Sequence, residues 1–226
     1  MKLKTLLMGA VASAAFAPMA LAEGHEGERG RDGEVKISYW QAPSILNPYL
    51  SSGTKDVESA SLILEPLGRY DETGALVPYL AEEIPTLENG GVTEDLKTIT
   101  WKLKEGLLWS DGTPVTSADV AFTAEYCMHP EGGCAQLAKF EGISSIETPD
   151  DLTIVVNFTE PKPNPYQAFM GGQSPIIQKA QFSECLGPKA PECTEANFNP
   201  IGTGPLLAAQ FPPNPLTPAA GPPPPP

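Results

Sequence analysis

Alternating apolar and polar residues predict strands in the middle of this chain. Ile99, Trp101 and Leu103 are separated by polar residues, and this period of two places three large apolar side chains on one face of a half-buried strand. The same alternation recurs over residues 152–158, which we pair with residues 143–148 as a predicted hairpin. We expect the apolar side of each strand to pack in the core.

A helix is predicted shortly after the first of these strands. Residues 110–113, Ser-Asp-Gly-Thr, have the composition of a tight turn. Thr116 is then predicted to be the N-cap of a helix, and Asp119, three residues later, can reach back toward that cap. The helix is expected to run to about Met128, because Pro130 stops it.

Weaker patterns predict further elements. They are a first strand over residues 35–41, a helix over 54–65, a short strand near 69–71 and a short helical piece over 166–170. Trp40 lies in the first of these strands, and we expect it to be a core or sheet-edge aromatic side chain.

Both ends of the chain differ from the middle in composition. Residues 1–22 combine a basic start, an apolar stretch and a small-residue cleavage site, a pattern that predicts a secretory signal peptide and a periplasmic mature protein. Residues 23–34 are polar and rich in glycine, and we expect them to be disordered. Residues 206–226 are predicted to be a proline-rich disordered or polyproline II tail, because nine of the fifteen residues over 212–226 are proline.

The charge of the chain is strongly acidic. It has 14 lysine and arginine residues against 28 aspartate and glutamate residues, which gives a formal net charge of −14 at pH 7. Such a charge repels nucleic acids and anionic lipids, so we expect no nucleic-acid partner. The charges are spread along the chain, which favours general solubility over a cation-binding face.

Four cysteines are expected to form disulfides in an oxidising compartment. Of the three possible connectivities we favour the local one, which joins Cys127 to Cys134 and Cys185 to Cys193 across short turns. Their spacings do not match the short pairs of structural zinc sites, and no C-x-x-C motif is present. The sequence also lacks a G-x-S-x-G elbow, an H-E-x-x-H motif and a P-loop, so we expect neither catalysis nor a cofactor.

Residues 101–122, which include the predicted turn and capped helix, closely resemble a signature of one family. It is the family of bacterial extracellular solute-binding proteins of the dipeptide, oligopeptide and nickel type, also called family 5. Asn47-Pro48-Tyr49, the hairpin after Phe140 and Gly202-Thr203-Gly204 occur in family order, so the resemblance covers about residues 35–205. We interpret the turn at Trp109 to Gly112 as part of a folding unit, in preference to a ligand contact.

The resemblance implies a fold and a function. Proteins of this family are built from two α/β lobes that enclose the ligand, and they are usually more than twice this length. A mixed α/β fold is therefore implied, in which residues 35–205 form the first lobe of a type II-like periplasmic binding protein and the second lobe is absent. The implied function is that of the substrate-binding component of an ABC importer. Its implied partners are a peptide or another small solute and the permease subunits in the inner membrane.

The resemblance also implies where the ligand is contacted. Ser52, Gly53 and Thr54 are the candidates for backbone contacts with a bound solute, and a plain helix start is an equally supported interpretation of the same residues. A different class of function is a secreted structural or interaction protein whose proline-rich tail docks a partner. A secreted hydrolase is a third class, which the missing catalytic motifs disfavour.

Overall fold

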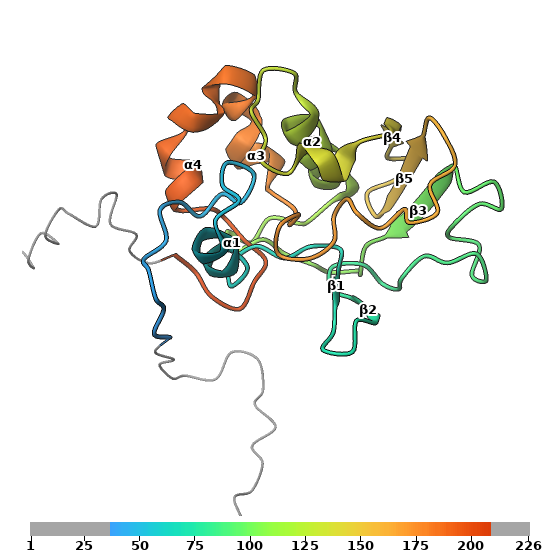
Figure 1. Ribbon diagram of the computed structural model, residues 1–226, viewed down its shortest axis with the longest axis horizontal. Coiled ribbons are helices and arrows are strands. Elements are labelled where there is room, and N and C mark those ends of the chain that lie inside the picture. The colour runs from blue at the N-terminus through green and yellow to red at the C-terminus, as the bar shows by residue number, and fades with distance from the viewer. Residues whose placement is uncertain (1–36, 209–226) are drawn as a thin grey trace, which may run out of the picture. The chain divides into compact units, whose positions relative to one another are not determined.

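The computed structural model describes residues 37–208 (Figure 1). The predicted signal peptide over 1–22, the polar segment over 23–34 and residues 209–226 of the predicted proline-rich tail lie outside this range. Residues 206–208 of that tail are described and are held by contacts, since the Leu206 N–H bonds the Leu62 carbonyl at 3.2 Å and Ala208 packs against the core, so the tail was predicted to begin too early. In chain order the elements are α1 (Thr54–Ala60), β1 (Gly68–Tyr70), β2 (Leu76–Pro78), β3 (Thr98–Lys102), α2 (Ser117–Met128), η1 (Leu137–Phe140), β4 (Ile143–Glu147), β5 (Thr153–Phe158), α3 (Lys179–Phe182), η2 (Ser183–Cys185), η3 (Gly187–Glu192) and α4 (Thr194–Phe198).

The predicted strands form an antiparallel sheet in the order β3-β5-β4. Trp101 lies opposite Ile154 and Ile99 lies opposite Val156, so the large apolar side chains share one face. Along β5 buried residues alternate with half-buried ones, as a period of two requires. The structure therefore confirms the strand predicted around Ile99 and Trp101 and the hairpin predicted over residues 143–158.

Helix α2 begins and ends where the sequence predicted. Thr116 is its N-cap, and Thr116 and Asp119 form a reciprocal capping box. The last helical residue is Met128, and His129 already has a non-helical conformation before Pro130. This helix packs against β5 and α3, so it connects the sheet with the later part of the chain.

A buried carboxylate ties the start of α2 to two other segments. The Asp119 Oδ2 atom accepts hydrogen bonds from the Thr116 backbone N–H at 2.9 Å and from the Trp109 indole N–H at 3.3 Å. Its Oδ1 atom accepts a bond from the Lys179 N–H, at the first residue of α3, at 2.9 Å. Trp109 is only 2% exposed. The structure thus confirms that this tryptophan belongs to the folding unit.

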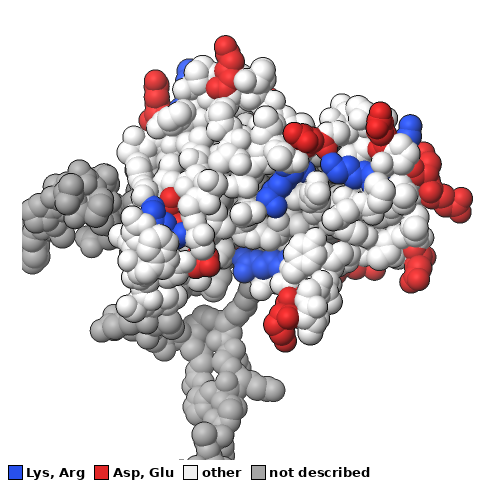
Figure 2. Space-filling model, viewed as in Figure 1, with Lys and Arg blue, Asp and Glu red and all other residues white. Residues whose placement is uncertain are grey.

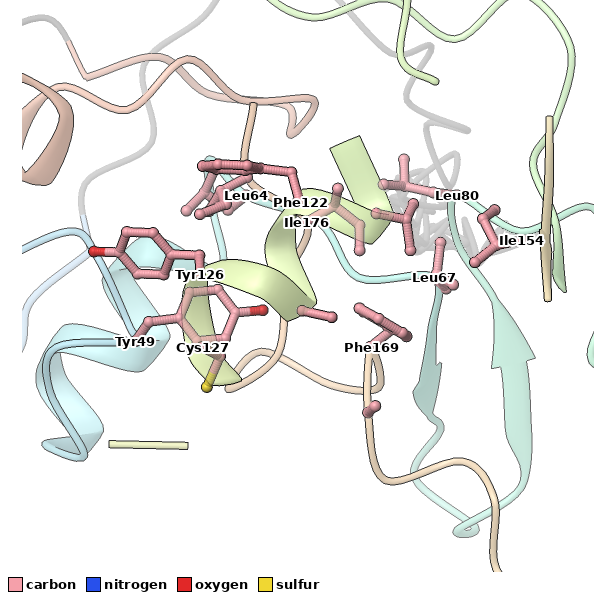
Figure 3. Packing of buried hydrophobic residues seen from close by; sticks show 14 of the residues in the cluster. Tyr49, Leu64, Leu67, Leu80, Phe122, Tyr126, Cys127, Ile154, Phe169 and Ile176 are labelled. Carbon is pink, nitrogen blue, oxygen red and sulfur yellow. The ribbon is translucent and has the colours of Figure 1, made fainter. Parts of the chain in front are cut away.

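Aromatic side chains join distant parts of the chain in the core. In Figure 3, Phe122, Tyr126 and Cys127 come from α2, and Tyr49 comes from the loop before α1. The rings of Tyr49 and Tyr126 have their centroids 6.1 Å apart, and Tyr126 also meets Phe182 edge-on at 5.9 Å. One continuous apolar cluster therefore extends from the sheet to the short helices near the end of the described chain.

The two disulfides have the local pairing that the sequence predicted. Cys127 is bonded to Cys134 with a Cα–Cα distance of 5.1 Å, and Cys185 is bonded to Cys193 with a distance of 5.8 Å. The first closes the turn after α2, and the second closes the segment between η2 and α4. The segments that the two disulfides enclose, residues 128–133 and 186–192, contain no strand and no long helix.

The helix predicted over residues 54–65 is shorter in the structure. It ends at Ala60, and Gly53 is its N-cap, so Thr54 is the first helical residue. Beyond the helix, the backbone carbonyl of Leu62 accepts a bond from the Leu206 N–H at 3.2 Å. The Ile63 carbonyl likewise accepts a bond from the Gly204 N–H at 2.8 Å. The predicted helix was too long because these two carbonyls bond a segment far away in the sequence instead of the next helical turn.

Two other predicted elements are absent from the described chain. Residues 37–41 form no strand, and Trp40 is 73% exposed, so the expectation of a core or edge aromatic was wrong. No described strand lies beside this segment to supply a ladder. Residues 166–170 form turns and not a helix, because Phe169 has a φ of 63° and its N–H bonds the Ser174 hydroxyl at 2.9 Å.

Candidate functional site

Ser52, Gly53 and Thr54 lie together at the end of a loop that leads into α1. The side chains of Ser52 and Thr54 are exposed, and Gly53 is half-buried. The Gly53 carbonyl accepts bonds from the N–H groups of Asp56 and Val57, both at 3.0 Å. Within residues 37–208, no acceptor bonds the backbone N–H of Ser52 or Thr54. The turn therefore starts the helix and also presents free backbone donors.

Asp56 fixes the conformation of this turn from the buried side. Its carboxylate accepts bonds from the Ser51 hydroxyl at 2.7 Å, the Lys55 ammonium at 2.8 Å and the Ser44 N–H at 2.5 Å. Burial raises the pKa of Asp56, but the bonds from Lys55, Ser51 and Ser44 outweigh burial and hold the pKa below its ordinary value. Asp56 is consequently ionised at neutral pH and links the loop over residues 44–51 to α1.

Asn47 anchors the same loop to the rest of the molecule. Its side-chain amide donates to the Tyr126 hydroxyl at 3.0 Å and to the Asn197 side-chain oxygen at 2.8 Å. Its own side-chain oxygen accepts the Tyr49 N–H at 3.0 Å. Burial raises the pKa of Tyr126 to about 12, so this hydroxyl stays neutral. The candidate turn thus rests on a support of hydrogen-bonded buried groups.

Two adjoining surface grooves flank helix α2, away from this turn. The larger has a volume of about 550 Å³ and the smaller about 420 Å³, and they share Ala118 and Lys179. The larger groove lies between α2 and the segment around β4, and among its lining residues are Ala121, Glu125, Met128, Ile146 and Thr148. Ser52, Gly53 and Thr54 line neither groove, so the structure does not bring the predicted ligand residues and these grooves together.

Sequence reasoning missed the grooves and the role of Asn47. The alanines at 118 and 121 lie three apart on α2, and small residues with this spacing leave a shallow surface on a helix. That spacing was the available signal for the groove. Asn47 was noted only as part of a family segment, and no local pattern reveals that its partners lie 79 and 150 residues away.

The charged side chains of the described chain form no concentrated site on the face shown in Figure 2. There the acidic residues are dispersed, mostly toward the edges, while several basic residues lie nearer the middle. Among residues 37–208, no group of three or more histidine, cysteine, aspartate or glutamate side chains is placed to hold a metal ion. No helix in that range has the length and apolar character needed to span a membrane.

The arrangement of sheet, helices and loops is that of a periplasmic solute-binding protein. The chain matches the structure of the PBP AgaA of A. tumefaciens R10, solved in complex with agropinic acid, with a TM-score of 0.64 and 29% identity over 75% of this chain and 32% of that one. The family model for bacterial extracellular solute-binding proteins, family 5 Middle, matches residues 75–215. This chain belongs to that family, whose members are substrate-binding proteins and not enzymes.

Two curated relatives show the same relationship in sequence. The "Probable peptide ABC transporter periplasmic-binding protein y4tO" of Sinorhizobium fredii is 35% identical over 72% of this chain and 28% of its own length. The periplasmic oligopeptide-binding protein OppA of Haemophilus influenzae is 27% identical over 57% of this chain and 26% of its own length. The chain therefore spans about a quarter of the length of the curated relatives it matches.

Proposed function

We propose that this chain acts in the periplasm as the substrate-binding component of an ABC importer for peptides, in partnership with permease subunits of the inner membrane. The observation that carries the proposal is the family match over residues 75–215. The names of the relatives supply the solute class, because y4tO and OppA are both named for peptide binding. Secretion through a cleaved segment over residues 1–22 is part of the same proposal.

In this proposal residues 35–205 form one lobe, and its contribution to binding is the turn at Ser52, Gly53 and Thr54. The backbone N–H groups of Ser52 and Thr54, which bond no acceptor among residues 37–208, suit the carbonyl groups of an extended peptide, which binds largely through its main chain. Asp56 holds the turn in place beforehand, so binding requires little reordering of the protein.

A single lobe should bind peptides weakly. Receptors that close around a ligand bury it on both sides and remove water from its polar contacts, whereas one lobe offers half of that surface. Titration calorimetry of the chain from residue 23 onward, with a mixed pool of di- to pentapeptides, should show no saturable heat at micromolar protein. Saturable binding near 1 μM, about 8 kcal/mol of free energy, would contradict the one-lobe proposal.

Weak binding can be located by NMR at millimolar peptide. We expect the amide resonances of Ser52, Gly53 and Thr54 to shift on addition of a tripeptide. Ser52→Pro removes one backbone N–H and should reduce these shifts, whereas Ser52→Ala keeps the N–H and should leave them unchanged. Circular dichroism of both variants verifies that they are folded. Shifts that appear only at the α2 grooves would show that the ligand turn has been misplaced.

A further inference from the structure

An exposed pair of aromatic side chains lies beside helix α1. Trp40 is 73% exposed and Tyr39 is 38% exposed, and their ring centroids are 6.0 Å apart at an angle of 38°. The Tyr39 hydroxyl donates to the Glu58 carboxylate, which attaches the pair to α1. Ile37, two residues earlier, is 60% exposed. We call Ile37, Tyr39 and Trp40 the aromatic patch, because exposed apolar residues gathered in this way are typical of a binding surface.

The last described residues arrive at the same helix. The N–H groups of Gly204 and Leu206 bond the carbonyls of Ile63 and Leu62, just beyond the end of α1. Leu62 follows Glu58 by four residues, so this segment and the aromatic patch are both attached to one short stretch of chain, and Figure 1 shows both beside α1. Leu207, the residue after Leu206, is 65% exposed.

The chain that follows has the chemistry that such a surface binds. Residues 209–226 carry no charged side chain, and nine of the fifteen residues over 212–226 are proline. Proline-rich segments take up the polyproline II conformation at little entropic cost and dock on exposed tyrosine and tryptophan rings. Ala208 packs against the core, and Pro212 is four residues further on, a distance of at most about 14 Å.

We propose that residues 212–226 dock as a polyproline II helix on the Tyr39–Trp40 pair of the same chain. A tether this short gives an effective concentration on the order of millimolar, which exceeds that of any second copy in dilute solution. The uncharged segment also meets no repulsion from an acidic chain. This interaction surface is independent of the proposed peptide import, and it makes the proline-rich segment an internal ligand.

Tryptophan fluorescence tests this docking directly. The chain has three tryptophans, and Trp101 and Trp109 are 1% and 2% exposed, so quenching by acrylamide reports on Trp40. The full chain should be quenched at least about threefold less than a variant in which all nine prolines over 212–226 are serine. A synthetic peptide of residues 212–226, added at millimolar concentration to the serine variant, should restore the protection.

Control variants show whether the protection comes from docking on the aromatic pair. Trp40→Phe removes the reporter and should abolish the difference between the proline and serine chains, which verifies that the signal comes from Trp40. Tyr39→Ala keeps the reporter and should make the full chain as accessible to acrylamide as the serine variant, which tests docking on the pair. A blue-shifted emission from Trp101 and Trp109 verifies folding in each variant. Equal quenching of the proline and serine chains would overturn the proposal. Protection from quenching that rises with protein concentration would also overturn it, because the tail of a second copy would then cover the patch. Protection that appears only when another protein is added would overturn it as well, because a foreign partner would then cover the patch.

Discussion

Strands β3 and β5 bury only apolar side chains, whereas the segments around the candidate turn bury polar ones. We call strands β3, β4 and β5 the sheet region and residues 42–67 with 174–206 the loop region. In the sheet region burial follows from the alternation of side chains along each strand. In the loop region the chain is held by individually placed polar groups, and the buried ones include Asn47, Asp56, Gln178 and Asn197.

The two regions reach a defined backbone by different routes. A strand satisfies its N–H and C=O groups by its own ladder, so apolar side chains suffice to hold it. Irregular chain has no ladder, and its polar groups must be bonded by side chains or by segments distant in sequence. The Cys185–Cys193 disulfide lies inside the loop region. The other disulfide joins Cys127, near the end of α2, to Cys134, and the N–H of the next residue, Ala135, bonds the Tyr49 carbonyl in the loop region.

The largest expected effect comes from reducing both disulfides. Closed loops of this size are each worth about 2.5 kcal/mol in the chain-entropy model, so reduction should lower the free energy of unfolding by about 5 kcal/mol. Urea unfolding with and without reductant measures this. An unchanged midpoint would show that the folded chain does not depend on these two covalent links, and a cross-pair found by non-reducing peptide mapping would contradict the pairing.

Gly202→Ala should have the next largest effect. A Cβ atom at this position would lie 2.0 Å from the Ile63 carbonyl oxygen, so the segment that bonds Ile63 and Leu62 must move away. We expect a loss of about 3 kcal/mol in the free energy of unfolding. Gly74→Ala is the control, because a Cβ there meets nothing within 4 Å and only its φ of 85° costs about 1 kcal/mol. Equal losses would contradict the close approach as the cause.

The third prediction compares one asparagine from each region. Asn47→Ala should lower the free energy of unfolding by about 2 kcal/mol, because it leaves buried partners in Tyr126 and Asn197 without their hydrogen bonds. Asn157→Ala in β5 should cost about 0.5 kcal/mol, because its partners reach solvent. Denaturant unfolding of both variants measures the difference. If the order were reversed, buried polar contacts would not distinguish the loop region from the sheet region.

The smallest expected effect depends on pH. The pKa of Asp56 is lowered in the folded protein, so its contribution to stability is present above the unfolded value of about 4 and is lost as the pH falls through the lowered pKa. Asp56→Asn should therefore destabilise the protein by about 1 kcal/mol at pH 7, and this difference should shrink toward pH 2. Denaturant unfolding at several pH values measures it. A difference that stays constant with pH would show that ionisation of Asp56 is not what stabilises the turn.

The sequence predicted the sheet region and α2 almost completely. A period of two, a turn composition and a capping box are local signals, and the strands, α2 and the short disulfide loops all follow from them. The loop region was predicted less well, because its conformation depends on distant contacts. Residues 54–65 have the pattern of one helix, yet the helix ends at Ala60, and the carbonyls of Leu62 and Ile63 accept bonds from the distant residues Leu206 and Gly204.

The candidate site was predictable only through family resemblance. Nothing in the local pattern separates Ser52, Gly53 and Thr54 from an ordinary helix start, and the structure shows them at a helix start. The support beneath them, Asn47 with partners in α2 and α4, has no sequence signal at all. Trp40 was misjudged because its alternating neighbours indicated a strand, and no described strand pairs with it.

The contacts of Asp119 explain what the family signature over residues 101–122 indicates about this chain. Both carboxylate oxygens are occupied by groups of the protein itself, the Trp109 indole, the Thr116 cap and the Lys179 backbone. A buried carboxylate that accepts these hydrogen bonds from its own chain fixes the start of α2 against Trp109 and α3. Recognising this segment in a sequence therefore identifies the architecture of the protein. The role of Asp119 in this chain is to hold the fold, so the segment around it indicates which fold is present and gives no information on which solute is bound.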